Sequence, residues 1–326
     1  MGRVEKSKQV KRNHHYVWSY YLKSWANGND LFYISKKGKI SKDSVKGLAK
    51  ETDFYKISPL NEEDVNLIRR FSRLSPPFLQ EEHESQLSHF IRLSNISKFI
   101  NSSEKRTDEL NRLDKVIKHN SLENMHSFYE DMSVKVIGAL RGGDRSILDN
   151  NQNMIAFCSY IGHQMSRTKS FKDKAKQALE GNVALRSQYP KESSLLEKNW
   201  WFISYMLGIN IGFSLYESKD RDKHILIENR TETPFITSDH PIINLHPDSL
   251  SKAENDVPES SDFYFPVSPK YAYMINHSSE YDSLEEKISE EMVKKLNRYI
   301  HEKSYRNVFS SNIESLKELN AHNKSN

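Results

Sequence analysis

The stretch KHILIENRTETPFITSDHPIINL, residues 223–245, decides the fold class of this chain. Its apolar residues alternate with polar ones, which is typical of short β-strands, and turn residues separate the runs. Similar runs follow at residues 262–268 (DFYFPVS) and 270–276 (KYAYMIN), so five short strands are expected in all. Residues 285–304 then predict a closing helix, and NVFSS at residues 307–311 predicts a last strand or extended piece.

An amino-terminal hairpin and a long helical region precede these strands. Residues 31–45, LFYISKKGKISKDSV, predict a β-hairpin with Gly38 in its turn. Residues 60–215 have a mostly helical pattern, with breaks at Pro76–Pro77 and Gly142–Gly143. This order indicates an α+β fold, in which a mainly antiparallel sheet from the hairpin and the carboxy-terminal strands packs on a large central helical region.

Residues 14–326 are expected to form a single domain after a flexible basic tail at residues 1–13, with separate helical and sheet domains as the alternative. Within the helical region, residues 151–176 have the clearest helical pattern. One side of this predicted helix is apolar, with Phe157 beside it. The members of the apolar side are Met154, Cys158, Ile161 and Met165.

The first segment after the tail, HHYVWSYYLKSWA (residues 14–26), carries ring-bearing side chains at helical spacing. Asn13 is a plausible N-cap for such a helix, and Asn27-Gly28 a plausible stop. The sequence therefore predicts a helix here, whose ring-bearing stripe faces the core. The members of the stripe are His14, Trp18, Tyr21 and Trp25.

Composition excludes several classes of protein. Aromatic residues make up 11% of the 326 residues, which indicates a folded core despite a mean hydropathy of −0.76. A single cysteine, Cys158, excludes an intrachain disulfide and a zinc site of several cysteines. The basic amino terminus has no apolar run behind it, so it is not a secretory signal, and we expect a cytoplasmic protein.

No membrane association is expected. The most apolar segment, Trp200 to Tyr216, would span about 25 Å as a helix, less than the ~30 Å hydrocarbon core. It also contains Asn210, two serines and two glycines, so it is expected to be a buried core element.

The net charge of +4 comes from the first 12 residues, which hold five basic side chains and one acid. The rest of the chain therefore has no net charge, and local basic patches would have to bind any anionic partner.

Six stretches, in this order, resemble the bacterial domain-of-unknown-function family numbered 4238. They are HHYVWSYYLKSWA, ETDFYKI, HQMSRTKSF, PFITSDHPI, FYFPVSPKYAYMI and LNRYIHEKSYRNVFSS. Two positions depart from the family pattern: Trp18 stands where proline is usual, and His240 stands where asparagine is common. The resemblance covers nearly the whole chain but implies no known activity, substrate or cofactor.

Two histidines, His14 and His15, are the first candidates for chemistry. Adjacent residues point about 100° apart on a helix and to opposite faces of a strand, so the two do not chelate one metal ion together. His14 is the better candidate, because its stripe faces the core. The alternative is an imidazole that caps the helix or bonds to the backbone.

Ser238-Asp239-His240-Pro241 is the second candidate centre. It is not a catalytic triad, because a strand places Asp239 on the face opposite to Ser238 and His240. It offers a carboxylate at a strand end, where Pro241 biases His240 toward an extended backbone. Alternatively, Asp239 is an Asx-turn residue that caps the loop.

Gln164 and Arg167 lie about one helical turn apart and can reach one ligand together. Arg167 could hold a phosphate or carboxylate with two hydrogen bonds, or form a buried ion pair with Asp239. Two basic groups accompany them, and they would line a groove for a phosphate backbone if their helices are neighbours; otherwise they are solvated helix faces. These groups are Lys169, Lys172, Lys174 and Lys176, and Lys294, Lys295, Arg298, Lys303 and Arg306.

Several common signatures fail. His83-Glu84 with His89 does not have the spacing of HExxH, and Arg141-Gly142-Gly143-Asp144 is no phosphate loop. GxSxG and GxGxxG do not occur in the sequence, and Cys158 is expected in the core.

The first functional hypothesis is a nuclease-like phosphodiester hydrolase, with a bacterial defence or toxin role as an extension. Asp239 and His14, with His240 as a further candidate, would hold a divalent metal ion or act as base and acid. Arg167 would stabilise charge on the phosphoryl group and Gln164 would orient the substrate. The further substrate-binding candidates are Tyr16, Lys169, Lys172 and Arg306.

The second hypothesis is a non-catalytic module that binds nucleic acid or protein through the basic tail and helices, with a homo-oligomer as one form of protein partner. A third alternative is purely structural, with the same residues forming a buried network between helix and sheet.

Overall fold

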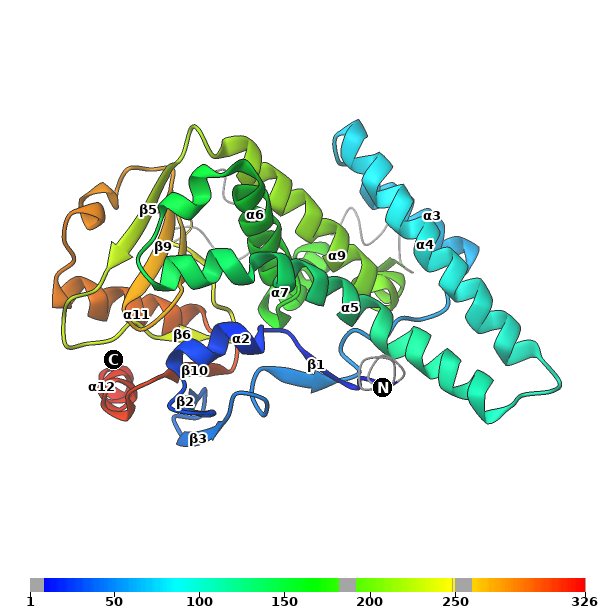
Figure 1. The fold of residues 1–326 in the computed structure, drawn as a ribbon, viewed down its shortest axis with the longest axis horizontal. Helices are drawn as coiled ribbons and strands as arrows, with labels where there is room; N and C mark the ends of the chain where they lie inside the picture. Colours follow the sequence, from blue (N-terminus) through cyan, green and yellow to red (C-terminus); the bar gives the residue numbers. More distant parts are fainter. Residues whose placement is uncertain (1–8, 182–191, 248, 250–259, 326) are drawn as a thin grey trace.

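The computed structural model describes residues 9–181, 192–247, 249 and 260–325 and has an α+β fold, as the sequence predicted (Figure 1). Strands at both ends of the chain lie on one side of the molecule, and long helices occupy the middle and the other side. The helices are α2 (Ser19–Leu22), α3 (Glu62–Ser72), α4 (Pro77–Ser102), α5 (Asp108–Arg141), α6 (Asn151–Ser166), α7 (Lys169–Gly181), α9 (Glu192–Ser218), α11 (Glu290–Lys303) and α12 (Ile313–Ser325).

The strands form two four-stranded antiparallel sheets and one two-stranded ribbon within the described residues. The first sheet has the order β3-β2-β10-β6, the second has the order β5-β9-β8-β7, and β1 pairs with β4. The strands are β1 (Asn13–His15), β2 (Asp30–Ser35), β3 (Ile40–Ser44), β4 (Lys50–Thr52), β5 (Lys223–Glu228), β6 (Thr237–Ser238), β7 (Ile243–Asn244), β8 (Phe263–Pro266), β9 (Tyr271–Asn276) and β10 (Asn307–Ser310).

The hairpin β2–β3 and the carboxy-terminal strands were expected to share one sheet, and the structure divides them differently. Only β10 and β6 join the hairpin; the other four strands form a sheet of their own. The hairpin itself is confirmed, and its turn glycine, Gly38, has φ +74°, a conformation that L side chains rarely adopt. Apolar side chains of both four-stranded sheets, α11 and α12 meet in one hydrophobic cluster.

The amino-terminal helix predicted over residues 14–26 is wrong. Residues 13–15 form β1 instead, and helical structure begins only at Ser19 and ends with a 3-10 turn at Lys23–Trp25. The helical spacing of the rings therefore holds only from Ser19 onward, because residues 13–15 pair with β4 instead. Tyr21 and Trp25 are fully buried, and each bonds to the sheet region. The Tyr21 hydroxyl donates to the Pro266 carbonyl and the Trp25 indole N–H donates to the Phe235 carbonyl.

The helix predicted over residues 151–176 is two helices. α6 ends at Ser166, Arg167 is its C-cap, and α7 starts at Lys169. The apolar side of α6 is buried as expected at Met154, Phe157, Cys158 and Ile161.

Three glycines allow α6 and α9 to pack closely. A Cβ added to Gly162 of α6 would lie 2.2 Å from the Gly208 carbonyl oxygen of α9, and one added to Gly208 would lie 2.5 Å from His163 Nδ1. A Cβ added to Gly212 would lie 3.0 Å from the Cys158 carbonyl oxygen. The contact therefore has no room for a side chain at these positions.

The apolar segment Trp200 to Tyr216 lies within α9, and its first half is buried in a cluster with side chains of α3, α4 and α5. In the part of the chain that the structure describes, no helix combines the length and the apolar character needed to cross a membrane.

The second half of the expected basic tail makes contacts, whereas residues 1–8 lie outside the described residues. The Lys11 amide donates to the Asn120 side chain of α5 at 2.8 Å, and the Lys11 ammonium donates to Asn124. Arg12 forms an ion pair with Asp53 at 2.5 Å. These bonds direct the chain into β1 against α5.

Candidate functional site

Arg167 is buried between α5 and α6, with 2% of its surface exposed. Its Nη1 lies 2.7 Å from Glu130 Oε1, and its Nη2 donates to the Gln164 side-chain oxygen at 2.7 Å. Although burial disfavours its charge, Glu130 keeps the pKa of Arg167 above its usual value. The suggested ion pair of Arg167 with Asp239 is wrong, because the partner is Glu130.

Gln164 and His14 are fully buried and hydrogen-bonded. The Gln164 amide donates to the Tyr16 carbonyl at 2.9 Å. His14 Nδ1 accepts the Tyr55 backbone N–H at 2.7 Å, and His14 Nε2 lies 2.8 Å from the Lys11 carbonyl oxygen. A neutral ring with its proton on Nε2 satisfies both contacts, so neither nitrogen is left for a metal ion.

The same interior holds two histidines that the sequence reasoning missed. His126 of α5 and His163 of α6 have ring centroids 5.7 Å apart, and none of their four ring nitrogens has a hydrogen-bond partner in the described structure. The His163 ring packs between Tyr129 and Tyr205, with centroids 4.0 and 4.9 Å away. Burial lowers the pKa of both histidines, that of His163 to about 3, so both rings are neutral near pH 7.

Two acids on α5 complete this interior. Burial, followed by the charge of Glu130, raises the pKa of Glu123 to about 7, and burial raises the pKa of Glu130 despite the nearby Arg167. Glu123, His126 and Glu130 are three and four residues apart, which places them on one face of the helix. That spacing in the sequence is the signal that would have identified them.

Asp239 is 1% exposed and lies directly after β6. Its Oδ1 accepts the backbone N–H of Tyr305 at 2.9 Å, and its Oδ2 accepts those of Arg306 and Asn307 at 2.8 and 3.0 Å. Burial raises the pKa of Asp239 to about 6, although these three hydrogen bonds lower it. The carboxyl group thus fixes the turn between α11 and β10.

His240 connects this turn to α7. Its Nδ1 lies 3.2 Å from the Thr168 hydroxyl, which also accepts the Phe171 backbone N–H at the start of α7. Burial lowers the pKa of His240 to about 3, and the nearby Lys174 and Lys303 lower it further. Lys174 of α7 and Lys303 at the end of α11 thus both lie near His240, which agrees with the groove hypothesis.

A basic and aromatic surface, here named the α7–β10 face, forms where these elements meet. The Lys36 amide donates to the Arg306 carbonyl at 2.8 Å, and the Lys36 ammonium lies 6.0 Å from the Tyr305 ring. The exposed Arg306 guanidinium lies 5.3 Å from the same ring. Lys172 on α7 acts on the pKa of nearby Lys169, and Lys303 at the end of α11 acts on that of His240, so two more cations lie close by; one acid, Asp173 of α7, hydrogen-bonds to Tyr305. The face consists of Lys36, Lys169, Lys172, Lys303, Tyr305 and Arg306.

Tyr16 lies between the face and the buried interior. The Tyr16 ring is 4% exposed and lies 5.4 Å from the Lys169 ammonium, which also pairs with Glu51. Burial, and then Arg306, lower the pKa of Lys169. Burial, and then the charge of Asp239, raise the pKa of Tyr16.

The site residues predicted from the sequence thus fall into two neighbouring groups. His14, Gln164 and Arg167 belong to the interior, while Asp239 and His240 hold the turn beneath the face. No three of the His, Cys, Asp and Glu side chains in the described ranges are placed to hold a metal ion together.

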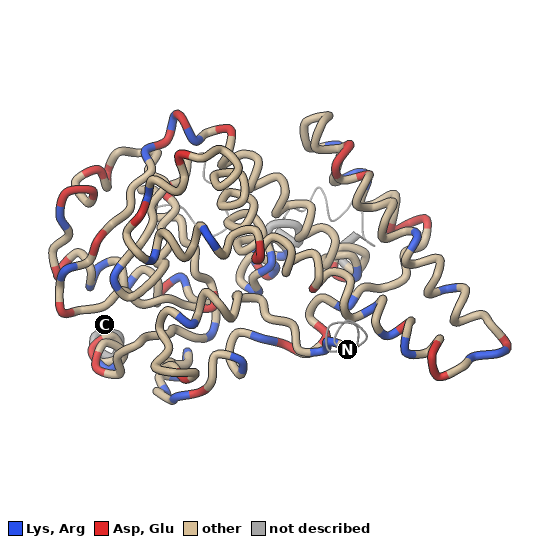
Figure 2. The backbone as a smooth tube through the Cα atoms, viewed as in Figure 1, with Lys and Arg blue, Asp and Glu red and all other residues tan. Residues whose placement is uncertain are grey.

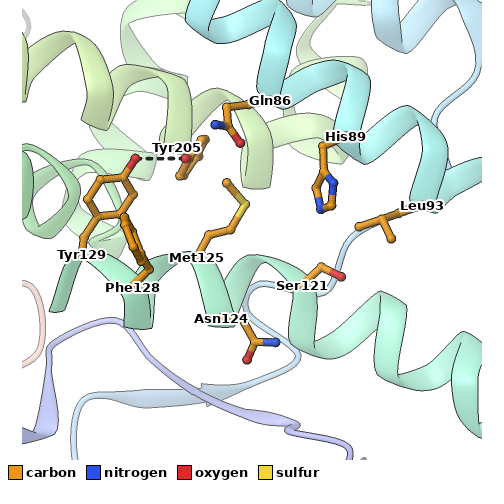
Figure 3. Close-up of a pocket in the computed structure, with 9 residues that line it drawn as sticks. All are labelled: Gln86, His89, Leu93, Ser121, Asn124, Met125, Phe128, Tyr129 and Tyr205. Atoms are coloured by element: carbon orange, nitrogen blue, oxygen red, sulfur yellow. Dashed lines mark hydrogen bonds between the residues drawn. The ribbon is translucent and has the colours of Figure 1, made fainter. Parts of the chain in front are cut away.

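The pocket in Figure 3 lies elsewhere, between α4, α5 and α9. It has a volume of about 420 Å³, and the Tyr129 and Tyr205 hydroxyls, 3.2 Å apart, meet at one end of it. None of the predicted site residues lines it. Figure 2 shows basic and acidic residues interspersed along the whole backbone, so the α7–β10 face is a local feature.

Comparison with known proteins gives one family. The family described as "Protein of unknown function (DUF4238)" matches residues 13–314, nearly the whole chain. No curated protein and no solved structure matches the chain.

Proposed function

We propose that this chain, which belongs to the DUF4238 family of proteins of unknown function, binds the phosphate backbone of nucleic acid through the α7–β10 face. One observation carries the proposal: Lys36 and Arg306, from distant parts of the sequence, both place their cations over the Tyr305 ring, at 6.0 and 5.3 Å from its centroid. Basic groups supply affinity for phosphates, and an accessible ring can stack on a base.

The electrostatics of the face support an anionic ligand. The charge of Arg306 contributes to the lowered pKa of Lys169, so the cations repel one another where they meet. A phosphate between them would relieve this repulsion. Arg306 is suited to such a contact because its guanidinium offers a planar fork of donors and its backbone is fixed by Asp239.

Phosphodiester hydrolysis stays a prediction with weaker support, and so do the defence role and the cytoplasmic location. The ring nitrogens of His14 already contact backbone groups, and the Asp239 carboxylate is almost fully buried. A catalytic role would need at least one of these side chains to reach a substrate.

The test is fluorescence anisotropy with labelled single- and double-stranded DNA and RNA over a range of salt concentrations. Lys172→Ala and Arg306→Ala should each weaken binding for all sequences and lower the slope of log affinity against log salt by about 1. Lys115→Ala is the matched control, because Lys115 is an exposed lysine near the start of α5.

Salt-independent binding, or an Arg306→Ala variant that binds as well as the wild type, would overturn the proposal. The same samples should be followed for cleavage with added Mg²⁺. Cleavage that Asp239→Asn abolishes without loss of stability would favour the hydrolase instead.

A further inference from the structure

Exposed apolar side chains gather on one part of the molecule. Of the nine large hydrophobic residues that are exposed in the described structure, eight lie between residues 74 and 134. The most exposed are Leu74, at 84%, just before α4, and Phe99, at 74%, near the end of α4. Figure 1 shows α4 on the outside of the molecule, away from both four-stranded sheets.

α4 has two separate stripes. One stripe, which includes Leu79, Leu87 and Phe90, is buried against the rest of the protein. The other stripe is exposed throughout and advances by alternating steps of four and three residues. That spacing is the 3.5-residue repeat by which one helix packs along another. The outer stripe consists of Phe78, Glu82, Ser85, His89, Arg92, Ile96 and Phe99.

The outer stripe is complementary to itself when it is reversed. In an antiparallel pair with Ser85 of one copy opposite His89 of the other, Glu82 faces Arg92 and Phe78 faces Ile96. Phe99 then extends past the start of the other α4 and meets Leu74. A two-fold axis repeats every contact, so polar and ionic layers lie at the centre and apolar layers lie at both ends.

We infer that this outer stripe is a homodimer interface, in which α4 of two copies of the chain pack antiparallel about a two-fold axis. Charge matching favours this occupant. The first half of the stripe carries the acid Glu82 and the second half carries the base Arg92, so a parallel pair would place like charges together. α4 has 26 residues and is about 39 Å long, enough for several consecutive layers of contact.

The side chains of the stripe stay exposed, although Phe78 also contacts the Phe213 ring of α9, with centroids 4.5 Å apart, and His89 lies at the edge of the pocket in Figure 3. In the described structure, Arg92 has no ion-pair partner, and Glu82 accepts only from Gln86, one turn further along α4. The apolar members of the interface are already exposed in the single chain, with Phe78 at 48%, Ile96 at 44% and Phe99 at 74%. Dimerisation would remove this apolar surface from water without a conformational change in either chain.

The test is sedimentation velocity of the full chain over the micromolar range. The wild type should form a dimer. Phe99→Glu and Arg92→Glu should each raise the dimer dissociation constant about tenfold or more, because they place a charge in an apolar layer or pair two acids. Lys287→Glu makes the same charge change at an exposed lysine between Glu285 and α11 and should leave the dimer unchanged.

A charge exchange between Glu82 and Arg92 is the most stringent part of this test. Glu82→Arg alone should weaken the dimer, whereas Glu82→Arg combined with Arg92→Glu should restore it, because the ionic pairs are then rebuilt in reverse. The two positions lie on the same helix ten residues apart and do not touch within one chain. A wild type that stays monomeric, or variants that all dimerise equally well, would overturn the inference.

Discussion

Replacing Arg167 by methionine distinguishes a structural role of this residue from a catalytic one. Methionine retains much of the length and apolar volume of arginine but has no charge. The substitution leaves Glu130, whose carboxylate lies 2.7 Å from the guanidinium and is 15% exposed, without its cation. It also removes the hydrogen bond that the Gln164 side-chain oxygen accepts from Arg167 Nη2.

The expected cost follows from this burial. Removing one partner of a buried ion pair destabilises a protein by about 3–5 kcal/mol, because the remaining charge is left in the interior. For a chain of this length each kcal/mol lowers the melting temperature by about 2–4 °C, so Arg167→Met should lower it by roughly 6–20 °C. Glu130→Met should also destabilise, since Arg167 is then the unpaired charge.

The double variant tests whether Arg167 and Glu130 stabilise the protein as a pair. With Arg167→Met and Glu130→Met together, no unpaired charge remains, so most of the lost stability should return, with a coupling free energy of about 2 kcal/mol or more. Denaturant unfolding of the four proteins measures this cycle. An Arg167→Met protein as stable as the wild type, or two losses that simply add, would refute the structural role.

Two further predictions concern the turn and the buried histidine. Asp239→Asn replaces one carboxylate oxygen by an NH2 group that cannot accept, so at least one of the three bound backbone N–H groups loses its acceptor; urea unfolding should show a loss of about 1–3 kcal/mol, and unchanged stability would contradict the assignment. Burial lowers the pKa of His163 from 6.5 to about 3, so the stability that its neutral ring contributes is complete above pH 6.5 and is lost as the pH falls toward 3. Asp239 and Glu123 have raised pKa values, so their effect on stability has the opposite dependence on pH. The wild type is therefore compared with His163→Phe, whose stability should fall less steeply below pH 6.5. Equal slopes for the two proteins would contradict this role of His163.

Local patterns were sufficient to predict much of the fold. The period-two runs after residue 220 and the hairpin turn at Gly38 correspond to strands in the structure. The sheets to which the strands belong depend on contacts between distant segments, which periodicity does not contain. For the same reason, His14 and His15 were assigned to a helix: their pairing with β4 is a tertiary contact.

The candidate site was predicted in its residue types more than in its geometry. Gln164 and Arg167 are adjacent as expected, but they bond to each other and to Glu130, which the motif did not include. The neighbouring positions of α7 and the end of α11 were stated as a condition, and the contacts of His240 with Lys174 and Lys303 and of Tyr305 with Asp173 agree with it. Tyr305 was missed because one tyrosine beside an arginine is not distinctive in a sequence.

The pairing of β2 with β10 has a consequence for the way the cell makes this protein. Phe309 of β10 lies opposite Tyr33 of β2, so the two central strands of one sheet come from opposite ends of the chain. On the ribosome, β2 is synthesised more than 270 residues before its partner β10. Until then one edge of the nascent hairpin has open backbone groups, which can pair with other chains. We expect this sheet to form only after residues 307–310 have emerged, and chains truncated before residue 307 to aggregate.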